Sequence, residues 1–261
     1  MTTKPKEQLP AIVIKESGDV LISRPDVTFD YDSIKSGYYD QVFRRYKGAQ
    51  SKWHHLKFAF VRDLLGDYKQ HLDIGCGPGT FLGMLDEEKI SIGVDISRPQ
   101  IDYAQKAYGS ASKNFIAIEP QKPLPFANAQ FDCVTMIELI EHIPLAETLI
   151  LLSQVRRILK PGGRLIVTTP NFSSLWPVIE KAVNAVSGLS YQEQHVEKYT
   201  KNYLRNVLTQ AGFLGVTAGS FQWTAPFWAP LNWRLSDTID RFEHKLFGDH
   251  GGLLLIGEAK R

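Results

Sequence analysis

The sequence predicts an α/β domain with a Rossmann-like, doubly wound and mostly parallel seven-stranded sheet that carries helices on both faces. Three observations lead to this fold class. Short β-rich runs alternate with longer helical patterns, and such alternation builds βαβ units with right-handed crossovers. The runs are almost continuously apolar, as expected of parallel strands buried on both faces. A glycine-rich loop follows the first run, where this fold class binds its ligands.

The apolar runs and helical patterns place the elements in order along the chain. Five parallel strands are expected at residues 71–75, 90–96, 114–119, 131–137 and 163–170. Two more strands, at residues 213–221 and 253–260, would close the sheet. Helices are expected at residues 80–88, 98–109, 145–159 and 201–212, and in "LAETLILLSQVRRIL" the apolar residues recur at helical spacing.

Composition and charge limit the class of protein. The 261 residues carry a formal net charge of only +2, so we expect no nucleic-acid partner. The two cysteines, Cys76 and Cys133, and the start "MTTKPKEQLP", which lacks a signal-like pattern, lead us to expect a cytoplasmic protein. No apolar run approaches the roughly 18 to 20 residues that span a bilayer.

The glycine-rich segment "LDIGCGPGTFL" (72–82) reads as a strand, a loop and the start of a helix. Its three glycines let the backbone turn tightly and approach a ligand closely, although a tight turn without a ligand would need them too. Asp95 closes the second strand about 20 residues after Gly75, where a carboxylate accepts hydrogen bonds from ribose hydroxyls. Loop and carboxylate together indicate a cofactor that contains ribose.

Four motifs in this order resemble the class I S-adenosylmethionine-dependent methyltransferases. They are "LDIGCGPGTFL", "GVDIS", "LPFANAQFDCVTMIELIEHI" and "RRILKPGGRLIVTTPN". The resemblance covers roughly residues 68–215. It is closest to the ubiquinone-biosynthesis O-methyltransferase type and its type 11 and 12 small-molecule relatives, on "IELIEHI", "TTPN" and "QHVEKYTKNYLRNVLTQAGF".

The resemblance implies which residues contact S-adenosylmethionine. Asp73 and the loop would hold the methionine end, Asp95 would bind the ribose and Ile96 would pack on the adenine. Glu119 is the candidate for the adenine amino group, but "IEPQKPLPF" departs from the usual spacing. The full expected set is Asp73, Gly75, Cys76, Gly77, Gly79, Asp95, Ile96, Glu119 and Ile137.

Acidic and histidine side chains gather after the fourth strand, in "MIELIEHIP" (136–144). One helical turn there would place Glu138, Glu141 and His142 on one face, and His195 would come from a loop over the same crevice. One interpretation is catalytic, with His142, Glu138 and His195 removing a proton or positioning the substrate. A second is a divalent metal site, Mg²⁺ or Zn²⁺, with Glu138, Glu141, His142 and His195 as ligands. The third is structural, and the residues alone leave all three open.

Aromatic segments flank the core and vary most from the family pattern. We expect an N-terminal cap and substrate segment at residues 1–60, a methyltransferase domain at 61–261, and lid inserts at about 172–198 and 221–250. Tyr39, Trp53 and Trp176 are the candidate substrate contacts. These rings could equally pack the cap onto the sheet edge. In "APFWAPLNWRLSDTIDRFEHKLFG", aromatic residues precede an amphipathic pattern, which suggests a peripheral membrane contact.

The function expected from these features is transfer of a methyl group from S-adenosylmethionine to a small-molecule or lipid-like acceptor, at oxygen. One alternative is a metal-dependent RNA 3′-terminal 2′-O-methyltransferase, whose family shares the Glu-x-x-Glu-His pattern. The other is a regulatory protein that binds the cofactor without catalysis. The identity of the acceptor and the oligomeric state are not encoded in any of these motifs.

Overall fold

The computed structural model describes residues 13–14, 20–21, 34–186 and 195–261. The chain divides into two compact units, Met1–Asp30 and Tyr31–Arg261. In the first unit the described residues are two short strands, β1 (Val13–Ile14) and β2 (Val20–Leu21), which pair antiparallel. The second unit contains all seven strands of the expected sheet.

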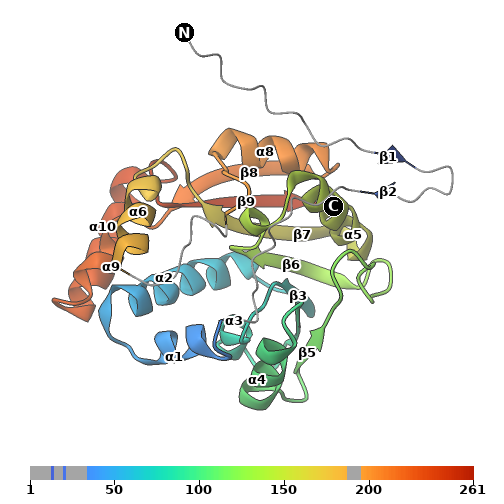
Figure 1. Cartoon of the computed structure of the whole chain (residues 1–261), viewed down its shortest axis with the longest axis horizontal. Coiled ribbons are helices and arrows are strands. Elements are labelled where there is room, and N and C mark those ends of the chain that lie inside the picture. Colours follow the sequence, from blue (N-terminus) through green and yellow to red (C-terminus); the bar gives the residue numbers. More distant parts are fainter. Residues whose placement is uncertain (1–12, 15–19, 22–33, 187–194) are drawn as a thin grey trace, which may run out of the picture. The chain divides into compact units, whose positions relative to one another are not determined.

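A seven-stranded sheet forms the centre of the second unit (Figure 1). Its strands lie in the order β5-β4-β3-β6-β7-β9-β8, and only β9 runs antiparallel to its neighbours. The strands are β3 (Gln70–Ile74), β4 (Ile90–Asp95), β5 (Lys113–Ala117), β6 (Phe131–Ile137), β7 (Leu159–Pro170), β8 (Leu214–Phe221) and β9 (Leu254–Lys260). The mostly parallel sheet predicted from the sequence is confirmed.

The chain reverses its winding direction between β3 and β6. It proceeds from β3 outward to β5, returns to the other side of β3, and continues from β6 towards the opposite edge. In open α/β sheets, ligands bind at such a reversal, outside the carboxyl ends of the strands. The fold therefore brings the glycine-rich loop and the acidic cluster together at the end of the sheet where ligands bind in this fold class.

Helices cover both faces of the sheet. Because successive strand residues point to opposite faces, Leu165 and Val167 of β7 belong to one apolar cluster and Ile166 to the other. The first cluster includes residues of α5 and α8, and the second includes residues of α2, α3 and α4. The helices are α1 (Tyr38–Arg44), α2 (Gly48–Leu65), α3 (Thr80–Gly83), α4 (Arg98–Tyr108), α5 (Leu145–Ile158), α6 (Trp176–Val186), α8 (Lys201–Gln210), α9 (Ala225–Trp228) and α10 (Trp233–Phe247).

The helix expected at residues 80–88 is much shorter than predicted. It ends at Gly83, after which the amides of Met84 and Leu85 bond to carbonyls three residues back. Such bonds tighten the last turn of a helix. The amide of Glu88 then donates to the Asp86 side chain (3.0 Å), which forms a turn instead of another helical turn. The prediction was wrong because local turn chemistry outweighs the apolar pattern.

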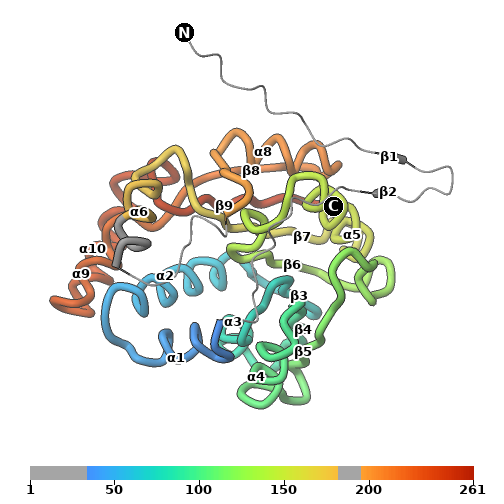
Figure 2. Tube along the Cα trace, in the orientation of Figure 1, coloured from blue at the N-terminus to red at the C-terminus, as the bar shows by residue number. Residues whose placement is uncertain are grey.

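The segments expected to form a cap and lids are largely helical. Residues 34–65 contribute α1 and α2, and the expected boundary at residue 60 falls inside α2, while residues 1–33 lie mostly outside the described part. The segment 172–198 contributes α6, and residues 187–194 lie outside the described part. The segment 221–250 contributes α9 and α10, and Figure 2 traces the chain from β8 through these two helices back to β9. Within the described ranges, no helix combines the length and apolarity needed to cross a bilayer.

Candidate active site

The glycine-rich loop joins β3 to α3 with a backbone that favours glycine. Gly75, Gly77 and Gly79 have φ angles of 77°, 51° and 76°, which L side chains adopt only with strain. A Cβ on Gly75 would lie 2.9 Å from the Leu139 side chain, whereas a Cβ on Gly77 would enter open space. Gly77 therefore borders open space that a ligand can approach. Gly75 and Gly79 instead lie where the loop packs too tightly for a Cβ.

Asp95 ties the end of β4 to this loop. Its Oδ2 accepts a hydrogen bond from the amide of Gly77 (2.8 Å), and its Oδ1 accepts one from the amide of Ser97 (2.9 Å). Ile96 follows with 48% of its surface exposed, as suits a residue that packs on a ligand. Glu119, beyond β5, is exposed and forms an ion pair with Lys122 (2.6 Å). The structure thus brings Asp95 to the loop and leaves Glu119 on the surface.

A buried hydrogen-bond chain lies under the loop and contains a histidine that no sequence motif marked. The Thr135 hydroxyl donates to Asp73 Oδ1 (2.6 Å), and His71 Nε2 lies 2.8 Å from the same hydroxyl oxygen. Burial lowers the pKa of His71 to about 3, so its ring is neutral. Burial, together with the charge of Asp95, raises the pKa of Asp73 to about 7, against a favourable hydrogen bond from Thr135. Asp73 therefore titrates near neutral pH when no ligand is bound.

Cys76, in the loop after β3, and Ile137, the last residue of the neighbouring strand β6, lie at the carboxyl ends of these strands. Burial raises the pKa of the Cys76 thiol well above its usual value, and the negative charges of Asp95 and Asp73 add to this effect. The thiol therefore stays protonated at neutral pH. Ile137 ends β6, is partly buried and packs on the apolar cluster beneath the loop. Neither side chain therefore adds a charge to this part of the site.

Glu138 departs from the single helical turn expected for the acidic cluster. It has a φ of 51°, a strained value for glutamate, and its amide donates to the Thr168 carbonyl (3.0 Å). The 3₁₀ turn that follows, η2 (Ile140–His142), begins only two residues later. The side chain of Glu138 instead forms an ion pair with Lys57 Nζ (2.5 Å), a lysine of α2 whose side chain is 4% exposed. The expectation that Glu138, Glu141 and His142 share one face was wrong, since the chain kinks at Glu138.

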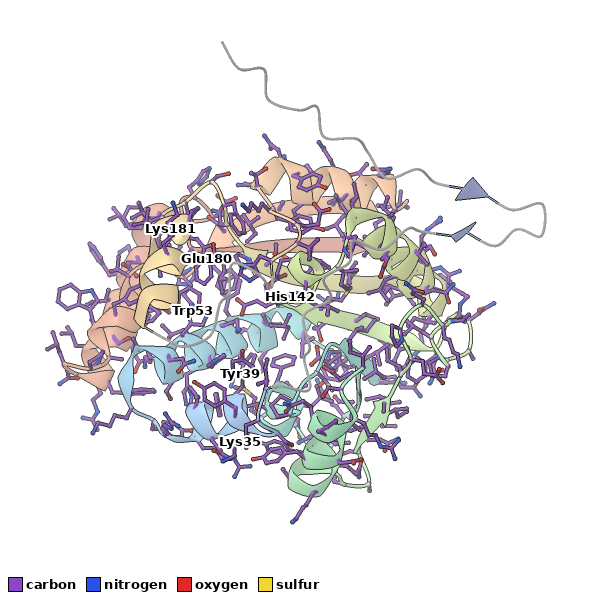
Figure 3. All side chains as sticks on the ribbon, viewed as in Figure 1. Lys35, Tyr39, Trp53, His142, Glu180 and Lys181 are labelled. Carbon is purple, nitrogen blue, oxygen red and sulfur yellow. The ribbon has the colours of Figure 1, made fainter. Side chains whose placement is uncertain are left out.

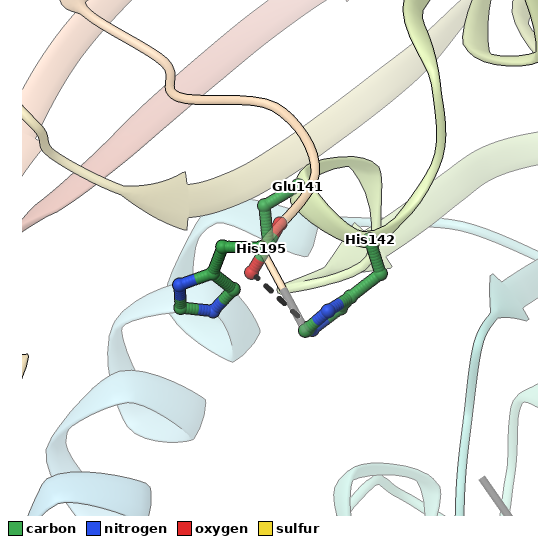
Figure 4. Close-up of side chains that lie close together, drawn as sticks. All are labelled: Glu141, His142 and His195. Atoms are coloured by element: carbon green, nitrogen blue, oxygen red, sulfur yellow. Dashed lines mark ion pairs between the residues drawn. The ribbon is translucent and has the colours of Figure 1, made fainter. Parts of the chain in front are cut away.

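Glu141, His142 and His195 do come together (Figure 4). One ligand atom from each lies within 4.8 Å of the others, and the two imidazole rings are 5.1 Å apart. Glu141 is fully buried, and neither of its carboxylate oxygens makes a hydrogen bond within the described part of the chain. Burial, reinforced by the charge of Glu138, raises the pKa of Glu141 to about 8. A buried carboxyl without hydrogen bonds, beside two imidazoles, fits either a cation or a polar ligand.

His195 is oriented by a carboxylate that no sequence motif marked. Its Nδ1 donates to Oε1 of Glu180 in α6 (2.5 Å), and both side chains are at least nine-tenths buried. This bond leaves Nε2 as the nitrogen available to the cluster. The signal in the sequence was a lone glutamate in an apolar helix of the insert, "LWPVIEKAV". Charged residues in such a position are almost always paired when buried.

Aromatic rings connect this cluster to α2 and α9. Trp176 lies 6.4 Å from the His195 ring, Trp53 lies 5.4 Å from Trp176, and Phe227 lies 6.4 Å from Trp53 (centroid distances). Figure 3 shows Trp53, Glu180 and His142 on three separate elements of this region. Tyr39, in α1, instead packs on His54 at 5.8 Å. Two of the three expected substrate residues therefore approach the histidine cluster, and Tyr39 occupies a separate contact.

Asp40 anchors the N-terminal helix over the loop, and no pattern in the sequence singled it out. This fully buried carboxylate of α1 accepts hydrogen bonds from the Thr80 hydroxyl (3.1 Å) and from the phenols of Tyr103 (2.7 Å) and Tyr108. Thr80 directly follows the last loop glycine. Asp40 therefore couples α1 to the helix that the loop leads into.

A family model described as a methyltransferase domain matches residues 41–218, which is more than half of the chain. The match covers β3 through most of β8 and includes the loop, Asp95 and the histidine cluster. It begins inside α1, so part of the N-terminal helical segment falls within it.

Curated relatives match shorter stretches. The chain is 28% identical over 140 residues to a ubiquinone biosynthesis O-methyltransferase of Dechloromonas aromatica, covering 52% of this chain and 57% of that protein. It is 36% identical over 104 residues to an O-methyltransferase of Aspergillus sclerotiorum, covering 38% and 39%. In both cases the match spans less than two thirds of the relative. A solved methyltransferase of Archaeoglobus fulgidus, described as S-adenosylmethionine-dependent, shares the fold with a TM-score of 0.60 at 22% identity, covering 86% of this chain and 100% of that one.

Proposed function

Because the chain belongs to the S-adenosylmethionine-dependent methyltransferase family, we propose that it transfers the methyl group to an oxygen of a small or lipid-like acceptor. The observation that supports this proposal best is the pairing of His142 and His195 at the carboxyl end of β6, next to the glycine-rich loop. A neutral imidazole in that position can take a proton from a hydroxyl. The O-methyltransferase relatives favour the same nucleophile.

The cofactor would bind on the side of the site formed by the glycine-rich loop. The ribose hydroxyls would donate hydrogen bonds to the Asp95 carboxylate. The open space at Gly77 leaves room for the methionine part of the cofactor. The ammonium group of the cofactor would face Asp73, where its charge favours the ionised carboxylate. These contacts bind the cofactor but do not by themselves activate an acceptor.

Methyl transfer from a sulfonium is an in-line displacement, so alignment and exclusion of water supply most of the acceleration. His142 would accept the hydroxyl proton as the oxygen attacks the methyl carbon. Glu180 holds His195 in one tautomer, and the Lys57–Glu138 ion pair fixes the kinked segment before the turn. Trp176 presents a buried indole N–H that has no hydrogen-bond partner within the described residues, so it can orient a polar acceptor group.

A divalent cation is the second role that the cluster can fill. The side chains of Glu141, His142 and His195 offer one oxygen and two nitrogens, a donor set suited to Zn²⁺. The hydrogen bond from His195 Nδ1 to Glu180 matches the carboxylate that commonly orients a metal-bound imidazole. The carboxylate oxygens of Glu141, which lack hydrogen bonds within the described residues, fit this role. When bound, such an ion would lower the pKa of an acceptor hydroxyl. Glu138, which faces Lys57, is outside this set.

The test is turnover with cofactor carrying a labelled methyl group, offered with a panel of phenols and long-chain alcohols, with and without EDTA. The proposal predicts a methyl ether as product, and His142→Ala should reduce turnover while cofactor binding stays unchanged. Full turnover in EDTA would eliminate the metal role. Labelled nitrogen or carbon products in place of ethers would refute O-methylation.

A further inference from the structure

The outward face of α10 has an unusual separation of charges. Each of the three acidic residues of the helix already has a partner: Asp237, whose side chain is 43% exposed, pairs with Lys52, Asp240 lies 3.8 Å from His244, and Glu243 accepts from the amide of Thr224 (3.0 Å). The exposed residues recur at helical spacing and contain no acid. They are Arg234, Leu235, Thr238, Arg241, Phe242, Lys245 and Leu246, and we call them the outer face of α10.

The apolar part of this face is large, and the neighbouring helix α9 also exposes apolar side chains. Phe242 and Leu246 are 62% and 60% exposed, and Phe247 adds a ring at the end of the helix. Phe227 and Trp228 of α9 are each more than two-fifths exposed, and Leu231, in the connection, is 77% exposed. Figures 1 and 2 show α9 and α10 side by side at one end of the sheet. Exposed apolar side chains gathered on two neighbouring helices in this way mark an interaction site.

We propose that α9 and the outer face of α10 dock on the surface of an anionic lipid bilayer, with α10 lying in the plane of the interface. Cations beside bulky apolar side chains on one helical face are the pattern of helices that bind in this way. Arg234, Arg241 and Lys245 complement anionic headgroups while the Leu and Phe side chains enter the acyl boundary. A two-fold contact between copies would instead bring cations against cations, and the one acid of the helix with a substantially exposed side chain, Asp237, is already paired with Lys52.

The docking face connects to the active site through aromatic rings. Phe227 contacts Trp53, Trp53 contacts Trp176, and Trp176 contacts His195, each within 6.4 Å between centroids. A lipid-like acceptor that leaves the bilayer at α9 would therefore meet an apolar route towards the histidines. This step rests on the proposed function, whereas the docking itself does not require catalysis.

The test measures co-sedimentation of the full chain with phosphatidylcholine vesicles, with and without added phosphatidylglycerol. Wild type should bind the anionic vesicles and release in high salt. Arg241→Gln with Lys245→Gln should weaken binding about 25-fold, from roughly a factor of five for each cation near an anionic surface. Phe242→Ser with Leu246→Ser should weaken it by more than about tenfold.

Matched controls remove exposed side chains elsewhere. Lys69→Gln with Lys106→Gln, and Ile150→Ser with Leu214→Ser, should leave vesicle binding unchanged, because these residues lie outside the docking face. Equal loss in the controls, or no binding by wild type, would overturn the proposal. So would a wild-type dimer that the Phe242→Ser and Leu246→Ser variant converts to monomer without any lipid binding. If the protein binds vesicles but transfers no methyl group, the proposed function is contradicted and the docking proposal is supported.

Discussion

The titration of the buried Asp73 carboxyl gives a quantitative test of the electrostatics beneath the glycine-rich loop. Replacing Asp73 with Asn keeps the shape of the side chain and an oxygen that can accept from Thr135. The native pKa is about 7, against an ordinary value of 3.8. Below pH 3.8 both folded and unfolded chains hold the proton, and no penalty exists. As pH rises towards 7 the native state binds more protons than the unfolded state, so the free energy of unfolding falls.

The size of the effect follows from the shift. About 3 pKa units at 1.36 kcal/mol each give at most about 4 kcal/mol of stability lost between about pH 4 and pH 7. The Asp73→Asn variant lacks this loss. The difference in free energy of unfolding between the variant and wild type should therefore grow in favour of the variant over that pH range and then stay level. The assay is urea unfolding at a series of pH values without cofactor. A stability difference that does not change with pH would refute the assignment of Asp73 as the group titrating near neutrality.

Other variants test neighbouring parts of the site. Asp95→Ala should weaken binding of S-adenosylmethionine roughly 10- to 100-fold in calorimetry, through lost charge-assisted hydrogen bonds, whereas Asp102→Ala on exposed α4 should not. His142→Ala should lower kcat by about 10²- to 10⁴-fold with cofactor affinity retained, and a loss of folding with normal turnover per folded molecule would indicate a structural role. Asp40→Asn should destabilise the chain by roughly 1–3 kcal/mol in thermal unfolding, because the hydroxyls of Thr80, Tyr103 and Tyr108 lose a charged acceptor that is itself buried, and an unchanged Tm would contradict this.

The sheet and the cofactor side of the site could be predicted because their signals are local. Each buried strand is a short apolar run, the loop needs glycine at defined positions, and Asp95 follows its strand directly.

The acceptor side depends on contacts between distant residues. Lys57 lies 81 residues before Glu138, and Asp40 lies 40 residues before Thr80, so no spacing in the sequence joins these pairs. The kink at Glu138 depends on hydrogen bonds to Thr168, in another strand. A helical-turn rule applied to "IELIEHI" cannot include that tertiary contact. Charged residues in helices otherwise rich in apolar or aromatic residues indicated that ion pairs would form, but the sequence did not show which residues pair.

A structure of the chain with S-adenosylhomocysteine bound tests the central claim most directly. We expect the ribose on Asp95, the sulfur outside the carboxyl ends of β3 and β6, and the His142 ring facing the position vacated by the methyl group. A product bound away from the glycine-rich loop would contradict the proposed site. So would a His142 ring that points away from the sulfur of the bound product.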